Sequence, residues 1–404
     1  MTRPTEGGVT GFVLAGGRRA LIRVLAGGSL VLGSPGAGAG QAIAGPLDVA
    51  VPMPPTVAKG TDGNTWLGYE LHLTNFSSRS WTLERLEVRL GEGAGPSLAV
   101  LEGEELRGSL RYPGGRGQTG EVSVGVIAPV GPGARVVVFL WLNVDADRLP
   151  AAEGLSHVIT VAQTDSAGQT SRVDVPYGPV PLVRNVPVLG PPLRGGTWLA
   201  ANGPSNTSGH RRALIPIDGR ARIAQRFGVD YVKVDEQGRT FSGDQADNAN
   251  YHAEGEAALA VSDGVVVAVK DSIPENVPGI NSRAVEITME TVGGNYVILD
   301  IGDGLYAFYA HLRPGSLAVE VGDLVERGDV LGQVGNTGNS TEPHLHFHLA
   351  DAATPLGSEG LPYAHDVFEL VGTCSAMRGG CDRSSARTVR QAMPLRNDLI
   401  RFPG

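Results

Sequence analysis

The feature that most constrains the fold is a repeated pattern of short apolar or alternating runs separated by turn residues. Examples are "WLGYELHLTNF", "ARVVVFLWLNV" and "NYVILDIGDGLYAFYAHL". The dipeptides Asp218-Gly219, Asp263-Gly264 and Asp303-Gly304 stand between such runs and are typical of tight hairpins. Glycine occurs 58 times and proline 27 times in 404 residues, and no long helical periodicity interrupts the pattern. The sequence therefore predicts an all-β protein.

The length of 404 residues exceeds what one hydrophobic core usually serves, so we expect more than one domain. Residues 46–183 contain regularly spaced short strands and predict an antiparallel β-sandwich. Residues 184–200 are rich in proline and glycine and predict a linker. Residues 201–404 hold seven of the nine histidines, from His210 to His365, and predict a second antiparallel β domain with a C-terminal extension.

Residues 1–45 have the order of a secretory signal: a basic cluster, an apolar stretch and small residues before a cut after Ala44. A plain disordered leader is the alternative. The only cysteines, Cys374 and Cys381, lie close together in a glycine-containing segment, which in an exported protein favours a disulfide. We therefore expect export to the periplasm, the cell envelope or the extracellular space.

The charge balance excludes some partners. The chain has 33 Lys and Arg against 42 Asp and Glu, a net charge of −9, and it carries no basic stripe, so nucleic-acid binding is not expected. No stretch after the leader is long and apolar enough to predict a transmembrane span.

Three histidines alternate in "GNTGNSTEPHLHFHLAD", at His344, His346 and His348, and strand geometry predicts that they share one face. A catalytic zinc site needs three protein ligands from His and carboxylate, an open position and a nearby group that transfers protons. The chain offers Asp230, His346 and a further upstream histidine as ligands, with His311 and His344 as acid/base candidates. A lone H-x-H is a weak signal, because alternating histidines also occur on solvated strand faces.

The runs "ALAVSDGVVVAV", "NYVILDIGDGLYAFYAHL" and "VEVGDLVERGDVLGQVGNTGNSTEPHLHF" resemble the core of the lysostaphin/LytM-type zinc endopeptidases from about Leu214 to Glu369. The resemblance implies an antiparallel β catalytic domain with a groove, one Zn²⁺ per chain and peptidoglycan cross-links as substrate. It implies that His346 binds zinc, and that His311 and His344 flank the activated water. His348 is then a supporting neighbour of the site.

The first motif of that family, H-x-x-x-D, is incomplete in this chain, because "RFGVD" retains Asp230 but has Arg226 in place of the histidine. Arginine is always protonated and cannot bind zinc. A subset of the family starts with an "HRRAL…QRFAID"-like stretch, which favours His210 as the replacement. A hairpin at Asp218-Gly219 predicts His210 on a strand opposite Phe227, from which only a bulge, a longer turn or a strand end would aim it at Asp230. The alternatives are His252 or a missing ligand.

The sequence thus predicts a zinc-dependent endopeptidase that hydrolyses peptide cross-links of bacterial cell-wall peptidoglycan, with His210, Asp230 and His346 on the metal. The alternative is a catalytically degenerate relative that binds cell-wall peptide or activates another hydrolase. The sandwich carries no recognisable chemistry and could bind an envelope protein partner.

Overall fold

The long strands near the start of the chain alternate in the direction of their side chains, which allows two sheets to close over one core. The computed structural model describes residues 45–93, 95–114, 127–149, 154–279, 283–375, 380–383 and 386–404. The predicted leader, residues 1–45, lies outside this part except for Gly45.

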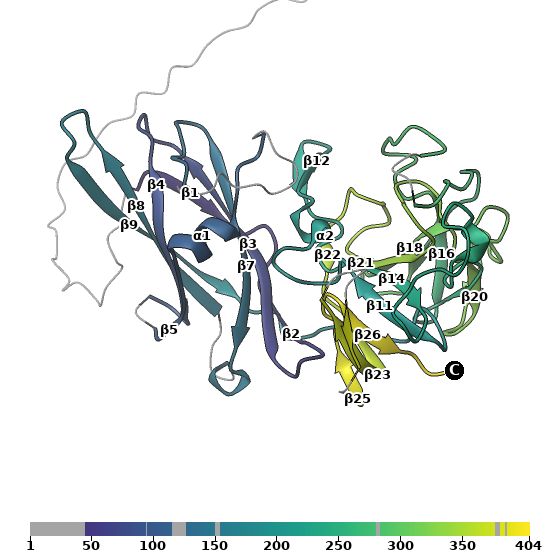
Figure 1. Ribbon diagram of the computed structural model, residues 1–404. Helices are drawn as coiled ribbons and strands as arrows, with labels where there is room; N and C mark the ends of the chain where they lie inside the picture. Colours follow the sequence, from purple (N-terminus) through teal and green to yellow (C-terminus); the bar gives the residue numbers. More distant parts are fainter. Residues whose placement is uncertain are drawn as a thin grey trace, which may run out of the picture. The chain divides into compact units, whose positions relative to one another are not determined.

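Two antiparallel sheets, coloured purple to blue in Figure 1, make up the N-terminal part. In the first sheet the order is β1-β3-β7-β6, with β2 also on β3; its strands are β1 (Leu47–Ala50), β2 (Thr56–Lys59), β3 (Thr65–Asn75), β6 (Leu110–Arg111) and β7 (Arg135–Val144). In the second the order is β5-β4-β8-β9, with β4 (Thr82–Leu90), β5 (Ser97–Glu102), β8 (Gly154–Thr164) and β9 (Thr170–Pro181). Helix α1 (Gly103–Ser109) and the 3₁₀ turn η1 (Ala146–Arg148) connect strands.

Strand β7 buries both of its faces. Its Val138 and Leu140 join a core shared by the two sheets, whereas Val137 and Phe139 point the other way and pack with Ile223 of the C-terminal part. This explains why "ARVVVFLWLNV" is almost continuously apolar rather than alternating. The five-stranded sheet therefore contacts the sandwich core on one face and the C-terminal part on the other.

The C-terminal part is built on a thirteen-stranded sheet in the order β10-β23-β26-β11-β14-β21-β18-β17-β16-β19, with β22 on β21 and with β24 and β25 on β23. Its strands are β10 (Val188–Leu189), β11 (Thr197–Ala201), β14 (Val229–Val234), β16 (Gly264–Lys270), β17 (Asn295–Asp300), β18 (Tyr306–Leu312), β19 (Leu324–Val325), β21 (Leu345–Ala350), β22 (Gly360–Leu361), β23 (Ala364–Cys374), β24 (Cys381–Asp382), β25 (Arg387–Ala392) and β26 (Asp398–Arg401). All pairs are antiparallel except β10 with β23. The prediction of an all-β, mainly antiparallel protein is confirmed.

Two small sheets and two short helical elements complete the fold. They are the pair β12 (Ile215–Ile217) and β13 (Arg220–Arg222), the pair β15 (Ala257–Leu259) and β20 (Val330–Gln333), helix α2 (Gly209–Arg212) and the 3₁₀ turn η2 (Asn248–Asn250).

Two of the three predicted hairpins are confirmed. The turn Asp218-Gly219 joins β12 to β13, and Asp303-Gly304 lies in the turn between β17 and β18, with a positive φ at each of these four residues. The hairpin at Asp263-Gly264 is wrong, because β15 pairs with β20 while β16 pairs with β17 and β19. There the Asp263 carboxylate accepts a hydrogen bond of 2.8 Å from the backbone N–H of Arg327 instead.

Residues 45–404 form one compact unit, so the division at residues 183 and 200 stays a prediction. The segment predicted as a linker, 184–200, contributes β10 and most of β11 to the large sheet. The predicted disulfide between Cys374 and Cys381 is present. Within the described residues, no helix has the length and apolar character needed to span a bilayer.

Candidate metal centre

Strand pairing brings the first two predicted ligands together. Asp230 on β14 lies directly opposite His346 on β21, and side chains in such antiparallel pairs are close neighbours. The distance between His346 Nδ1 and Asp230 Oδ1 is 2.8 Å. On its other side β21 pairs with β18, which places Ala310 beside His346 and His311 at the next position.

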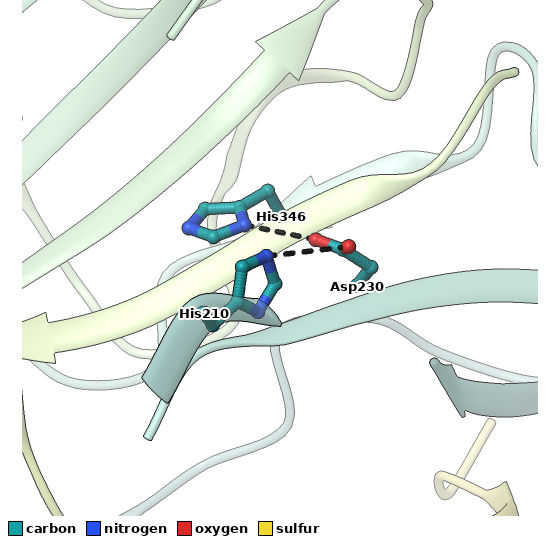
Figure 2. Close-up of side chains that lie close together, drawn as sticks. All are labelled: His210, Asp230 and His346. Atoms are coloured by element: carbon teal, nitrogen blue, oxygen red, sulfur yellow. Dashed lines mark hydrogen bonds and ion pairs between the residues drawn. The ribbon is translucent and has the colours of Figure 1, made fainter. Parts of the chain in front are cut away.

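Helix α2 brings His210 to the same point. Its Nε2 lies 3.4 Å from Asp230 Oδ2, and Figure 2 shows the rings of His210 and His346 converging on the two oxygens of this carboxylate. The predicted place of His210 on a strand, opposite Phe227, is wrong. The strand pairing of the hairpin ends at Ile215, so the chain is free to form one helical turn before it. That turn, rather than a bulge, aims the imidazole at Asp230.

The donor set fits a zinc ion. His210 Nδ1 lies 3.2 Å from the carbonyl oxygen of Gly228, so a tautomer that donates there leaves Nε2 for a metal. His346 Nε2 lies 2.9 Å from His348 Nδ1, so donation to His348 leaves Nδ1 of His346 for the same metal. Such outer hydrogen bonds normally fix the tautomer of zinc-binding histidines. The ligand atoms of His210, Asp230 and His346 all lie within 4.8 Å of one another, and two His with one carboxylate is a known catalytic zinc set.

Asn202 orients the carboxylate and was missed by sequence reasoning. It follows β11 in the left-handed region, with φ of 48°, and its side-chain amide donates a 3.0 Å hydrogen bond to Asp230 Oδ2. The Asn202-Gly203 dipeptide signals a turn after a strand. Nothing in the sequence indicates that this turn folds back onto Asp230.

His311 and His344 present their Nε2 atoms to the same space. The Nδ1 atoms lie 2.8 Å from the carbonyl oxygens of Thr337 and Glu342 respectively, which favours tautomers that donate from Nδ1. The two ring centroids are 4.8 Å apart, and His344 Nε2 lies 3.4 Å from Asp230 Oδ1. His311 has a φ of 65°, a strained value for a residue with a side chain, and such strain is typical of functional positions.

Burial and neighbouring charges shift the pKa values of Asp230, His344 and His311 in different ways. Burial would raise the pKa of Asp230, but the nearby His210 and His344 hold that pKa well below its ordinary value. Burial lowers the pKa of His344, and the Asp230 charge more than offsets this, so the net shift is upward. Burial together with the charges of His344 and His346 holds the pKa of His311 well below its ordinary value. Its surroundings therefore favour the neutral form of His311, whereas the Asp230 charge favours the protonated form of His344.

The other histidines of this part lie outside the ligand group. His348 is buried against His346, and its Nε2 has no hydrogen-bond partner among the described residues. His252 lies nearest to another carboxylate, with its Nε2 3.8 Å from Asp235 Oδ2. His365 is packed in the core, bonded to the hydroxyl of Tyr231.

Arg226, at the position of the missing family histidine, does not point into the site. Its guanidinium forms ion pairs of 2.9 Å with Glu70 and 2.8 Å with Glu359, and only 2% of the side chain is exposed. The expected first ligand position is thus occupied by a structural ion network.

A pocket of about 380 Å³ opens over the histidines. Besides the predicted site residues, it is lined by side chains that sequence reasoning did not single out, among them Asn202, Gln225, Arg283, Asn339, Ser340, Thr341 and Glu342. Four of these come from "NSTE", which only Pro343 separates from H-x-H. The sequence signal that could have identified these four residues is their place in a polar loop beside the predicted H-x-H histidines.

Comparison with known proteins finds similarity to one family in the segment that carries three of these histidines. Residues 249–357 match Peptidase family M23; this segment contains His311, His344 and His346, whereas His210 and Asp230 precede it. Over 76 residues the chain is 37% identical to the peptidoglycan DD-endopeptidase ShyA of Vibrio cholerae, covering 18% of this chain and 17% of that protein. Over 56 residues it is 46% identical to lysostaphin of Staphylococcus simulans, covering 14% and 11%.

A longer similarity extends to the cell division protein DipM of Caulobacter vibrioides, with 28% identity over 206 residues, 48% of this chain and 30% of that protein. The chain therefore spans less than a third of the length of each of these three relatives. Among solved structures, the catalytic domain of the M23 protein EnpA from Enterococcus faecalis matches with 21% identity and a TM-score of 0.25, covering 44% of this chain and 93% of that one.

Proposed function

We propose, from the match of residues 249–357 to Peptidase family M23, that the chain is a zinc-dependent endopeptidase that hydrolyses peptide cross-links of bacterial peptidoglycan. The observation that carries the proposal is the convergence of His210, Asp230 and His346, each with a ligand atom turned to one point, beside His311 and His344 in one pocket. The similarity to a peptidoglycan DD-endopeptidase supports the substrate class.

His210, Asp230 and His346 would hold the ion beside the pocket. A zinc ion bound there would lower the pKa of a water molecule and polarise the scissile carbonyl. Asn202 and Gly228 keep the ligands in place, because the first donates to Asp230 and the second accepts from His210.

His311 and His344 divide the proton transfers between them. His311 donates from Nδ1 to the Thr337 carbonyl, so its Nε2 is left to accept a proton from the attacking water. His344 lies beside Asp230, and in its protonated form the Nε2–H can donate a hydrogen bond to the carbonyl oxygen as charge develops, while the proton taken up by His311 passes to the leaving amine.

We place the chain outside the cytoplasm. The disulfide between Cys374 and Cys381 supports this, because such bonds persist in oxidising compartments. The basic and apolar order of residues 1–45 points the same way. An envelope protein that binds the sandwich remains part of the proposal.

The degenerate, non-enzymatic alternative rests on Arg226 and on the acidic, strand-rich N-terminal part, and Arg226 is its main argument. That argument weakens because Arg226 is engaged with Glu70 and Glu359, while a different histidine stands beside Asp230. A binding protein without activity would have no use for two further histidines with their Nε2 atoms aimed into the pocket.

The test combines metal analysis with release of peptides from purified cell wall, on wild type, His210→Ala and His252→Ala. We expect one zinc per wild-type chain, loss of zinc and activity in His210→Ala, and retention of both in His252→Ala. Wild type that holds no zinc and releases no peptide refutes the enzyme. Full zinc in His210→Ala refutes only the assignment of that ligand.

A further inference from the structure

The helix that carries His210 cannot hold its position alone. Helix α2 has four residues, and its N-cap Ser208 makes no side-chain capping bond. Helices this short are not stable in water without tertiary contacts. The position of the first ligand therefore depends on what surrounds the helix.

The two residues after His210 are anchored in the sandwich. Arg211 is fully buried and donates hydrogen bonds of 3.0 Å and 2.8 Å to the carbonyl oxygens of Tyr69 on β3 and Leu140 on β7. Arg212 donates a 2.9 Å bond to the Gly108 carbonyl, and its guanidinium lies over the ring of Phe139, 4.4 Å from the centroid. Two adjacent side chains thus tie α2 to two strands and a helix of the N-terminal part.

Glu70 on β3 connects this anchor with the segment that leads into β14, the strand that carries Asp230. Its Oε1 forms a 2.8 Å ion pair with Arg211, without the alignment of a hydrogen bond, and its Oε2 accepts a 2.9 Å hydrogen bond from Arg226. Arg226 also pairs with Glu359, so the network contains two arginines and two carboxylates in the order Arg211, Glu70, Arg226 and Glu359.

The network is neutral only when Glu70 is ionised. Burial alone would raise the pKa of Glu70, but the charges of Arg226 and Arg211 hold that pKa below its ordinary value. The Glu70 and Arg211 side chains are 0% exposed. Buried ion pairs contribute little net stability compared with apolar packing, but they impose a defined geometry. That geometry spans both chain segments that meet at the metal ligands, since Gly228, two residues after Arg226, accepts from His210.

We propose that Glu70 is a positioning residue for the metal site: through Arg211 and Arg226 the sandwich holds His210 against Asp230, so the peptidase completes its ligand set only with the sandwich in place. This inference rests on the proposed function. It gives the sandwich a role in the chemistry of the pocket, although none of the sandwich residues that the structure describes lines the pocket.

The test uses the full chain and measures the affinity for Zn²⁺ by chelator competition, together with the absorption spectrum of bound Co²⁺. Glu70→Gln keeps the shape of the side chain and removes its charge. The control is Thr61→Val, which removes a buried hydrogen bond from Thr61 to Asp398, also between the N-terminal part and the large sheet but away from α2. Both variants are compared at a temperature at which circular dichroism shows them folded.

We expect Glu70→Gln to bind Zn²⁺ about 10–100-fold more weakly than wild type, the range for residues that support metal ligands, with an altered Co²⁺ spectrum. Thr61→Val should keep the affinity and spectrum of wild type even where its melting temperature falls. Wild-type affinity in folded Glu70→Gln, or an equal loss in Thr61→Val, overturns the inference.

If Glu70→Gln does not fold, Glu70→Asp replaces it, because it retains the charge with a shorter reach. A loss of about 10-fold, the lower end of the same range, is then expected, and unchanged affinity overturns the inference. His346→Ala serves as the reference for the site itself. If His346→Ala weakens binding and the Glu70 variants do not, only the positioning role fails. If wild type binds no Zn²⁺, the proposed function fails and the inference with it.

Discussion

The candidate site has two halves that are held in different ways. Asp230 and His346 stand opposite each other on paired strands near the middle of a thirteen-stranded sheet. His210 stands on a four-residue helix whose neighbouring side chains reach into a different sheet. The strand-borne half is fixed by a backbone hydrogen-bond ladder, and the helix-borne half by buried charge.

This difference shows where a metal site is robust and where it can be adjusted. A ladder of backbone bonds keeps its register whatever the outer side chains are. A short helix keeps its place only while its tertiary contacts persist. The strand-borne ligands should therefore tolerate changes in the sandwich, whereas His210 should respond to them.

The largest effect is expected from removal of a strand-borne ligand. His346→Ala should lower the Zn²⁺ affinity by more than about 100-fold, beyond the range for supporting residues, and abolish peptide release. Chelator competition and cell-wall digestion measure the two effects, with His252→Ala as the histidine control. Near-normal Zn²⁺ affinity in His346→Ala would show that the strand-borne half does not hold the metal.

A smaller effect is expected from a residue that lies beside the ligands. His344→Ala should retain zinc and reduce kcat by about 10²–10⁴-fold, the usual contribution of a general acid or base. Metal content and kcat are measured on the same preparation. Loss of zinc together with kcat would instead make His344 a ligand and would change the composition of the strand-borne half.

The same division explains what could be predicted from the sequence. Alternation and turn residues are local signals, so the strands and the shared face of His344, His346 and His348 follow from them. The helical turn at His210 depends on contacts such as that of Arg211 with Tyr69, which are 142 residues apart. No local pattern reports such a contact, and the expected hairpin register for His210 was wrong for this reason.

The prediction of hairpins from Asp-Gly dipeptides is limited for the same reason. Asp218-Gly219 and Asp303-Gly304 join strands that pair with each other, whereas the strands around Asp263-Gly264 pair with distant partners. At the first two positions both residues of the dipeptide have the positive φ of a tight turn, whereas Asp263 and Gly264 do not, so the dipeptide alone does not decide which strands pair.

A further prediction concerns the support of Asp230 at the junction of the two halves. Asn202→Gly removes the amide that donates to Asp230 and tolerates the left-handed backbone, so the fold should persist. We expect about a 10-fold loss of Zn²⁺ affinity, the lower end of the range for supporting residues. Asn397→Gly, also at a positive φ, is the matched control and should bind Zn²⁺ as wild type does. Equal affinities in the two variants would remove Asn202 from the site.

The smallest effect on the site is expected from Asp398 on β26, which accepts a hydrogen bond from Thr61 of the N-terminal part. Burial raises the pKa of Asp398 to about 6; Asp62 adds to the rise, while Thr61, the Leu395 N–H and Arg387 oppose it. The folded state therefore binds this proton more tightly than the unfolded chain does. The resulting stability is full below about pH 4, declines as the pH rises, and is lost above about pH 6.

Asp398→Asn keeps the shape and the acceptor oxygen of the side chain but removes its charge. The variant should therefore become more stable than wild type as the pH rises from about 4 to about 6. We expect a gain of about 1–3 kcal/mol in the free energy of unfolding at pH 7 and none at pH 4. Urea unfolding at both pH values measures the gain. Zn²⁺ affinity at pH 7 should stay at the wild-type level, because Asp398 holds the sandwich contact without touching α2 or its arginines. A gain that is the same at both pH values would mean that packing rather than ionisation limits this contact.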